Sequence, residues 1–131
     1  AVGATRYNET RASYSNYGSS LDLVAPGGDL NRDDNHDGYG DGVLQQTFNP
    51  NTKDRSDFGY WFFNGTSMAT PHVAAVAALV IANRNATTPA DVRTALQSTA
   101  DDLGKRGRDD QFGYGIVNAA RALTWSVPPA P

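Results

Sequence analysis

The segment SMATPHVAAVAALVIA, residues 67–82, is one of the most apolar in the chain and constrains the fold more than any other. From Val73 onward, apolar side chains occupy nearly every position, so the helix that this composition favours has no polar face. A helix of this kind is buried on nearly all sides. The segment therefore predicts a long internal helix of a larger protein rather than a helix that lies on a surface.

The start of this helix has two possible registers. The dipeptide at 64–65, Asn-Gly, predicts a turn because both residues tolerate a positive φ, and Thr66 or Ser67 then caps the helix. Alternatively, Pro71 is the first helical residue and Thr70 is its cap. If the helix begins at Ser67, the proline removes the bond that the Ser67 carbonyl would have received. The sequence leaves both registers open, and a serine that only caps a helix needs no catalytic role.

Composition excludes several classes of protein. The chain has 131 residues, of which 39% are hydrophobic, 13 are glycine and 7 are proline, which indicates one domain without a large independent core. The net charge is −3, and the one basic cluster, KRGR at 105–108, runs into two aspartates, so nucleic acid is not an expected partner. The absence of cysteine excludes disulfides, thiolate metal sites and cysteine nucleophiles. No apolar run approaches the length of a membrane span, so no membrane partner is expected.

The remaining elements are short. We expect strands at 1–4, 21–25, 43–48 and 58–63. A second helix begins at Pro89 with Thr88 as its cap, and GIVNAARALTW predicts a short strand followed by a last helix capped by Asn118. Strands alternate with helices in the second half, which favours an α/β layered fold with Ser67 at a strand-to-helix junction. Because AVGAT starts as if inside a buried strand, we expect the chain to be a piece of a longer protein.

Ser67 also has a chemical interpretation. A serine hydroxyl is a weak nucleophile, so it needs a base within hydrogen-bonding reach and donors for the oxyanion that forms. A helix start supplies free N–H groups and a positive dipole end. His72 lies five residues further on, about 140° round a helix, so it faces away from Ser67. His36, the only other histidine, lies in an aspartate-rich loop, so either the base is missing from this chain or Ser67 is only a cap.

The stretch NGTSMATPHVAAVAAL, residues 64–79, resembles the nucleophile motif of the subtilisin-like serine proteases. The resemblance extends in order to RASYSNYGSSLDLVAPG before it and to GYGIVNAARAL after it. It implies a three-layer α/β subtilisin-like fold with a mainly parallel sheet, of which this chain is the carboxy-terminal half. On this basis residues 1–125 are the carboxy-terminal part of a peptidase domain, with a calcium-loop insertion at 29–42, and residues 126–131 are a proline-rich tail or linker.

The resemblance implies that Ser67 attacks the peptide carbonyl of a protein or peptide substrate. Its own N–H forms part of the oxyanion hole, Gly65 gives the close turn, Thr66 supplies the cap geometry, and Met68 lies on the cleft wall. In this family the aspartate, the histidine and an oxyanion-hole asparagine precede the matched stretch, and residues 1–66 contain no such motifs. We therefore expect the amino-terminal part of the same protease as a partner, and no activity from this chain alone. An α/β-hydrolase elbow fits less well, because Ala69 stands where that motif has glycine.

The loop DDNHDGYGDG predicts a calcium site. Its oxygen donors fall at alternating positions, with Gly38 where a calcium loop turns sharply; they are Asp33, Asn35, Asp37, the Tyr39 carbonyl and Asp41. The usual closing glutamate is absent, since Leu44 takes its place, so the alternative is a solvated turn. Two functions remain: a secreted, calcium-dependent serine endopeptidase, of which this chain carries the nucleophile, and a non-catalytic calcium-stabilised module or inactive remnant of a subtilase.

Overall fold

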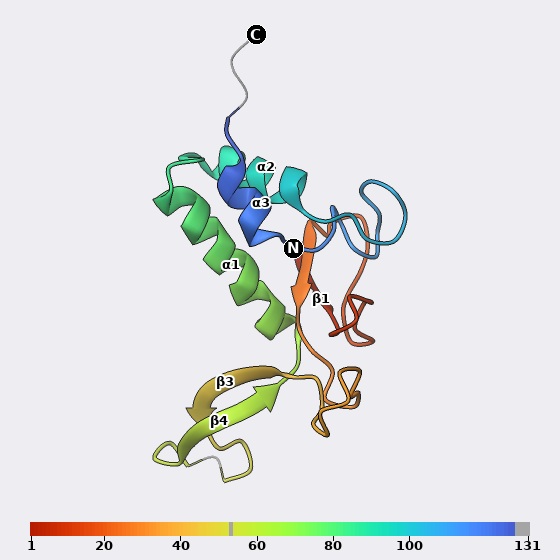
Figure 1. The fold of residues 1–131 in the computed structure, drawn as a ribbon, viewed down its shortest axis with the longest axis vertical. Coiled ribbons are helices and arrows are strands. Elements are labelled where there is room, and N and C mark those ends of the chain that lie inside the picture. Colours follow the sequence, from red (N-terminus) through yellow and green to blue (C-terminus); the bar gives the residue numbers. More distant parts are fainter. Residues whose placement is uncertain (53, 128–131) are drawn as a thin grey trace.

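A computed structural model describes residues 1–52 and 54–127 (Figure 1). Its central element is a pair of parallel strands, β1 (Val2–Thr5) and β2 (Leu23–Pro26), paired in register from Val2 opposite Leu23 to Thr5 opposite Pro26. Both strands lie within two residues of the predicted ranges. The strand expected before the last helix is reduced to a single parallel bridge between Ile116 and Val24, which adds a third, minimal strand beside β2.

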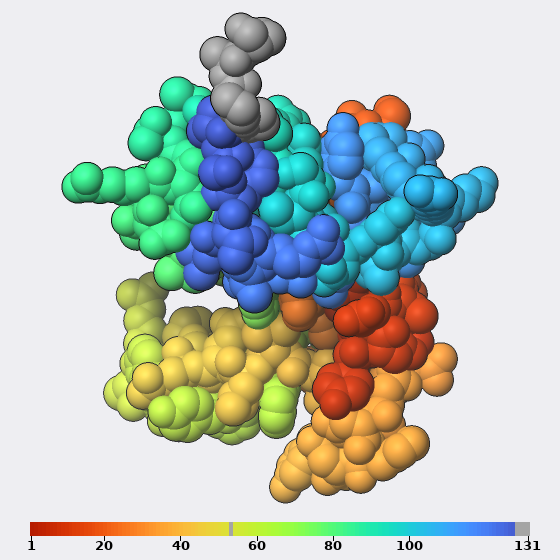
Figure 2. Space-filling view, turned by 45° about the horizontal axis from the view of Figure 1, so that its top comes forward, coloured from red at the N-terminus to blue at the C-terminus, as the bar shows by residue number. Residues whose placement is uncertain are grey.

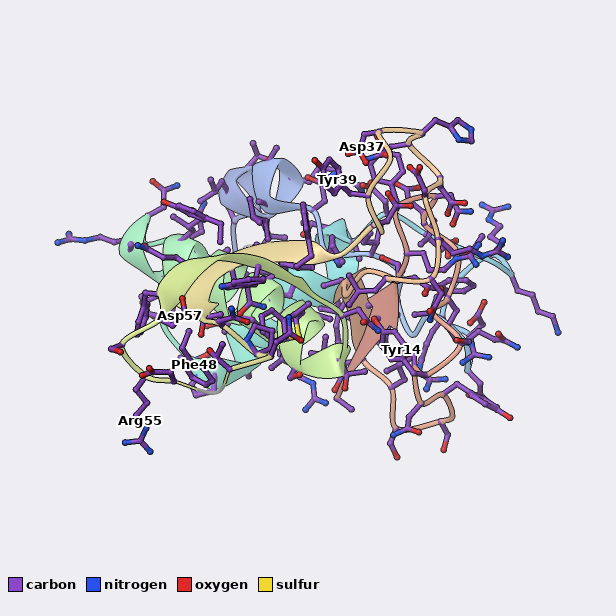
Figure 3. The ribbon with its side chains drawn as sticks, turned by 90° about the horizontal axis from the view of Figure 1, so that it is seen from below. Tyr14, Asp37, Tyr39, Phe48, Arg55 and Asp57 are labelled. Atoms are coloured by element: carbon purple, nitrogen blue, oxygen red, sulfur yellow. The ribbon has the colours of Figure 1, made fainter. Side chains whose placement is uncertain are left out.

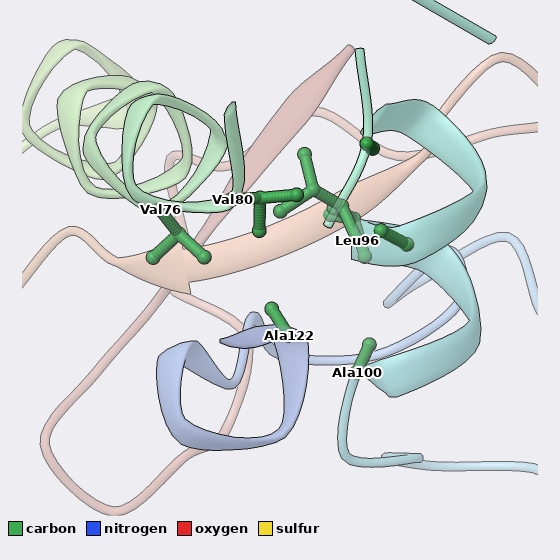
Figure 4. Close-up of a cluster of buried hydrophobic side chains, with 8 residues drawn as sticks. Val76, Val80, Leu96, Ala100 and Ala122 are labelled. Atoms are coloured by element: carbon green, nitrogen blue, oxygen red, sulfur yellow. The ribbon is translucent and has the colours of Figure 1, made fainter. Parts of the chain in front are cut away.

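Three helices pack beside this sheet. α1 (Thr66–Ala82) contacts both strands, and α2 (Pro89–Thr99) and α3 (Ala119–Thr124) pack against α1. Small and branched side chains from the sheet and all three helices interlock in one core (Figure 4), whose buried members are Leu23, Val76, Val80, Ala86, Ala95, Leu96, Ala100 and Ala122. Helices and a parallel strand pair in layers agree with the α/β fold expected from the sequence.

Two predicted helix caps are confirmed. The Thr88 hydroxyl accepts a hydrogen bond from the Asp91 N–H at 3.2 Å and donates to the Asp91 carboxylate at 2.7 Å. The Asn118 side chain accepts from the Arg121 N–H at 2.9 Å and starts α3. Each cap satisfies an orphan donor of its helix.

The second unit of the chain is a hairpin of β3 (Val43–Phe48) and β4 (Phe58–Phe63), both at their predicted ranges. It lies beyond the amino end of α1 and forms a lobe beneath the helices (Figures 1 and 2). The strands alternate between exposed and half-buried residues, so one face carries the exposed large side chains Leu44, Phe48, Phe58, Tyr60 and Phe62. The other face turns toward the start of α1.

Burial of α1 differs from the sequence prediction. Only Ala69, Val76 and Val80 are buried, while Leu79 and Ile81 are 48% and 52% exposed. The elements of this chain cover one side of α1 and leave an apolar side in contact with solvent. No helix within residues 1–52 and 54–127 is long and apolar enough to cross a membrane. Of the predicted tail at 126–131, residues 128–131 lie outside the described part of the chain.

Candidate active site

Gly65, rather than a hydroxyl residue, caps α1. It precedes the first helical residue with φ 153°, and no side chain bonds to the helix start. The Gly65 carbonyl accepts from the N–H of Met68 at 3.0 Å and of Ala69 at 3.3 Å. The capping roles predicted for Thr66, Ser67 and Thr70 are therefore wrong, because the glycine carbonyl already takes the donors that a capping hydroxyl would take.

Pro71 lies inside α1, so the register that begins near Ser67 is the one adopted. The Thr70 hydroxyl does not cap the helix but donates to the Thr66 carbonyl at 2.8 Å. The Ser67 carbonyl lacks the donor that an ordinary residue at 71 would supply. This loosened first turn is the one that carries the predicted nucleophile.

A backbone hydrogen bond ties this turn to the end of β2. The Gly65 N–H donates to the Gly27 carbonyl at 2.9 Å, and the N–H groups of Gly27 and Gly28 both donate to the Thr5 carbonyl, at 3.0 and 3.1 Å. The start of α1 is thus fixed to the carboxyl ends of both parallel strands. This is the edge at which open α/β sheets place their sites.

Ser67 is exposed at this edge. Its hydroxyl lies 3.5 Å from the Met68 sulfur, and within residues 1–52 and 54–127 its N–H donates to no protein acceptor. A hollow of about 300 Å³ opens in front of it, lined by Val43, Gln45, Ser67, Met68, Pro71, His72 and Ala75. Met68 thus lies beside Ser67 on the wall of the hollow.

The two histidines do not activate Ser67 in this structure. His72 lines the hollow, but its Nδ1 pairs with the Met68 carbonyl at 2.8 Å, one turn back along α1. His36 has a positive φ of 61° and lies in the aspartate-rich loop. In the part of the chain that the structure describes, no histidine contacts the Ser67 hydroxyl, so the site lacks a base.

The aspartate-rich loop folds around its own carboxylates. Asp33 accepts from the N–H groups of Asp37 and Gly38 at 3.0 and 3.1 Å, and the Asn35 side chain also accepts from the Asp37 N–H. The Asp37 carboxylate accepts from the Tyr39 N–H at 2.9 Å. Gly38 makes the predicted sharp turn with φ 88°. The loop therefore bends as the calcium-loop pattern predicts.

Asp41 closes this loop from inside. It is 8% exposed, and one carboxylate oxygen accepts from the Asp34 N–H at 2.6 Å while the other is buried without a protein partner. Among the described residues, no three His, Cys, Asp or Glu side chains are placed together to hold a metal. The donors are all oxygens, which suits a hard cation, and the unpartnered oxygen of Asp41 is the one whose burial a cation would offset.

One contact of the nucleophile turn was not predicted from the sequence. The Tyr14 hydroxyl donates to the Gly28 carbonyl at 2.7 Å, directly beside Gly27 and Gly65. The residue lies in a polar loop whose composition predicts only a turn, so no local pattern marked it.

The parallel strands and the helices packed on them form an α/β fold, and an exposed serine lies at the carboxyl edge of its sheet, at the start of α1. The family model described as Peptidase S8, the subtilase family, matches residues 1–115, and the chain belongs to this family of serine proteases. It is 43% identical over 122 residues to alkaline elastase YaB of Bacillus sp. (strain YaB), and 40% identical over 122 residues to subtilisin Savinase of Lederbergia lenta.

These matches cover 93% of this chain but only 26% of the elastase and 36% of Savinase. Among solved structures, a lanthipeptide protease is 36% identical with a TM-score of 0.76, and a protease from Pseudoalteromonas arctica is 37% identical with a TM-score of 0.77. The chain covers 41% and 34% of these two proteins, and each match covers 93% of the chain. The chain thus spans about a quarter to two fifths of the length of these four proteins.

Proposed function

We propose that this chain carries the nucleophile of a serine endopeptidase. The observation that supports this most directly is the exposed Ser67 at the start of α1, with its N–H free of protein acceptors and a hollow in front of it. The N–H and the positive end of the helix point to the place where an oxyanion forms.

In the proposed reaction, the Ser67 oxygen attacks the carbonyl carbon of a peptide bond and its proton passes to a histidine of the completing segment. The tetrahedral oxyanion accepts a hydrogen bond from the Ser67 N–H and from an asparagine of that segment. The histidine then protonates the leaving amine, and water hydrolyses the acyl-enzyme by the reverse proton transfers. Gly65 holds the turn, and Met68 bounds the hollow on the side of Ser67.

The amino-terminal part of the same protease is the proposed partner that supplies the aspartate, the histidine and the asparagine. Two features of this chain support it. The outer side of α1 is apolar and exposed, and an apolar groove of about 490 Å³ lies between β1, α1 and α2, with Val2, Val73, Ile81 and Leu96 among its lining residues. Exposed apolar surfaces of this kind commonly mark a place where another segment or partner packs.

The test uses a fluorophosphonate probe, which labels only an activated serine. The 131-residue chain alone should not react, because an unassisted serine hydroxyl is protonated at neutral pH. Addition of the Asp-, His- and Asn-bearing segment of a relative such as alkaline elastase YaB should produce labelling and peptide hydrolysis. Ser67→Ala should abolish both labelling and hydrolysis while the two segments still associate. Ser13→Ala, at an exposed loop position, is the control and should retain labelling, hydrolysis and association. Strong proteolysis by the chain alone contradicts the proposal.

The alternative is a non-catalytic, calcium-stabilised module or inactive remnant. It is favoured by the absence of a base near Ser67 among the described residues. The same experiment separates the two functions, since a remnant binds the completing segment without labelling or hydrolysis.

We also propose that the loop 29–42 binds calcium through Asp33, Asn35, Asp37, Asp41 and the Tyr39 carbonyl. Asp33 and Asn35 already accept hydrogen bonds from the Asp37 N–H, which preforms the turn, and the buried unpartnered oxygen of Asp41 needs a cation or a donor. Like charges at this spacing repel one another unless a cation neutralises them. Calcium therefore orders the loop and stabilises the folded state.

A melting curve with calcium and with chelator tests this site. Calcium at a hundred times its Kd stabilises the folded chain by about 2.7 kcal/mol, so the midpoint should rise by several degrees. Asp37→Ala should remove the calcium-dependent shift, and Asp57→Ala, in the hairpin turn outside the loop, should retain it. An unchanged midpoint together with no calcium by elemental analysis excludes the site.

Secretion is the proposed localisation, because a loop of weak calcium affinity is useful mainly where calcium is abundant. A fractionation of the producing culture tests it: the protease should accumulate in the medium, and retention of the mature protein inside the cells contradicts it.

A further inference from the structure

Tyr14 contacts the nucleophile turn from outside the site. Its hydroxyl donates to the Gly28 carbonyl at 2.7 Å, and the side chain comes from the loop between β1 and β2, which lies beside β1 in Figure 3. The residue is 36% exposed, so its ring is partly open to solvent while its hydroxyl is bonded to the protein. A hydroxyl that donates to a carbonyl restrains the position of that carbonyl.

Gly27 connects this hydroxyl to the turn. A Cβ added to Gly27 would lie 2.8 Å from the Tyr14 oxygen and 2.9 Å from the Gly65 carbonyl oxygen, so both groups lie close to the Gly27 backbone. The Gly27 carbonyl accepts the Gly65 N–H at 2.9 Å, and the next carbonyl, of Gly28, accepts the Tyr14 hydroxyl. Tyr14 therefore fixes the Gly28 carbonyl, and the Gly65 N–H bonds to the neighbouring Gly27 carbonyl.

The position of Gly65 determines the position of Ser67. Gly65 caps α1 through its carbonyl and is held in place through its N–H, and Ser67 follows two residues later with its own N–H free. The loosened first turn of α1 adds no strong restraint, because Pro71 offers no donor to the Ser67 carbonyl. A displacement of about 1 Å at this turn is enough to misalign both the attacking oxygen and the oxyanion donor.

We propose that Tyr14 is a positioning residue, which acts through Gly28 and Gly27 to hold the Gly65 turn so that Ser67 is aligned for acyl transfer. This inference rests on the proposed peptidase function of Ser67. In this role Tyr14 contacts neither Ser67 nor the reacting atoms of the substrate. It therefore affects the rate of the chemical step rather than the binding of substrate.

The surroundings of the hydroxyl suit a permanent donor. Burial raises the pKa of Tyr14 above its ordinary value, and the negative charge of Asp29 raises it further. Hydrogen bonding by the Gly65 backbone and the Asn64 side chain lowers this pKa and offsets part of the rise. The group therefore stays protonated throughout the neutral and mildly alkaline range and keeps its proton for the Gly28 carbonyl.

Tyr14→Phe, which removes only the hydroxyl, tests the role in the protease completed by its Asp-, His- and Asn-bearing segment. One hydrogen bond of ordinary strength predicts a kcat lower by about 3- to 10-fold, with KM unchanged. Tyr17→Phe is the matched control: it lies three residues on, is 66% exposed, and its ring, which stacks on Arg11, is retained. A normal kcat in Tyr14→Phe, or an equal loss in both variants, overturns the proposal.

Hydrogen exchange of the Gly65 amide provides a measurement that does not depend on activity. This N–H should exchange faster in Tyr14→Phe than in the wild type, while amides of α2 exchange as before. Unchanged protection of Gly65 overturns the proposal even if kcat falls. If the completed wild-type protein neither labels nor hydrolyses, the peptidase function fails, and faster Gly65 exchange in the variant still identifies Tyr14 as the residue that holds the turn.

Discussion

The nucleophile turn is held by glycines, each of which is required for a different reason. Gly65 has φ 153°, a backbone conformation that side chains rarely adopt, and its carbonyl caps α1. Gly27 is required for space, because a Cβ there would lie 2.5 Å from the Ala4 Cβ as well as against Tyr14 and Gly65. Both glycines lie in the stretches that resemble the family, but the reason for Gly27 could not be predicted, since the atoms near it come from distant segments.

Gly27→Ala should therefore destabilise the chain by about 1–3 kcal/mol, the usual cost of inserting an atom into a closely packed region. Gly59→Ala is the control, because a Cβ on Gly59 meets only Trp61, at 3.2 Å or more. Urea unfolding measures both variants. Equal stabilities of the two would show that the contacts at Gly27 relax without cost.

Met68 is the second residue on which a prediction rests. Its sulfur lies 3.5 Å from the Ser67 hydroxyl on the wall of the hollow. Oxidation to the sulfoxide makes this side chain polar and bulkier, so peroxide should reduce turnover of the completed protease. Met68→Ala should abolish the sensitivity. Full activity of enzyme whose Met68 is oxidised, as verified by mass, would place this residue outside the working cleft.

Among the elements, α2 and α3 are joined by Asp101. Its carboxylate accepts from the Asn118 side chain at 2.7 Å and from Arg121 at 2.7 Å, and both bonds lower the pKa of Asp101. The cap of α3 and the end of α2 thus share one charge. The ionised Asp101 carboxylate contributes its full stabilisation of the folded state above the pKa of about 3.9 that it has in the unfolded chain. This stabilisation is lost as the pH falls through the lower pKa of Asp101 in the folded chain.

Asp101→Asn should reduce stability at pH 7 by a few tenths to about 1 kcal/mol, since the pair with Arg121 is half exposed. The difference from the wild type should shrink as the pH falls below about 4, where the wild-type carboxylate is also neutral. Asp110→Asn, which removes a looser pair with Arg108 at 3.4 Å, is the comparison. Urea unfolding of all three proteins at pH 7 and pH 2.5 measures this, and a pH-independent difference would contradict the assignment.

The elements also separate what the sequence predicts from what it leaves open. Thr88 and Asn118 were predictable as caps because each bonds a backbone N–H three residues away. The strands of the hairpin were predictable from their composition, β-branched and aromatic between turn signals. The start of α1 was not, because the bond from Gly65 to Gly27 is made across 38 residues and decides the register. The sequence offered no base for Ser67, and no histidine among the described residues contacts its hydroxyl.

At the scale of the whole molecule, α1 is the element whose burial departs most clearly from what its composition predicts. The sequence gives it no polar face, yet only three of its residues are buried, and its outer side presents Leu79 and Ile81 to solvent. β1 pairs with β2 along one edge, and on its other edge Thr5 forms an antiparallel bridge with Arg11. The chain covers 26% and 36% of two of its relatives, which therefore contain further residues that could cover the exposed side of α1.

Leu79→Glu should therefore leave the isolated chain folded and prevent its assembly with the completing segment. In the isolated chain the side chain is 48% exposed, so the substitution removes little buried area and should change the thermal midpoint by no more than about a degree or two. In the assembled protease the carboxylate would be buried without a partner, which costs several kcal/mol. Binding of the Asp-, His- and Asn-bearing segment, measured by calorimetry, should weaken at least about 100-fold, and Ser67 labelling at micromolar concentrations should disappear with it. Thr94→Glu, at an exposed position of α2, is the control and should assemble normally. Assembly of Leu79→Glu with wild-type affinity would show that the outer side of α1 stays in solvent, and that the completing segment binds elsewhere.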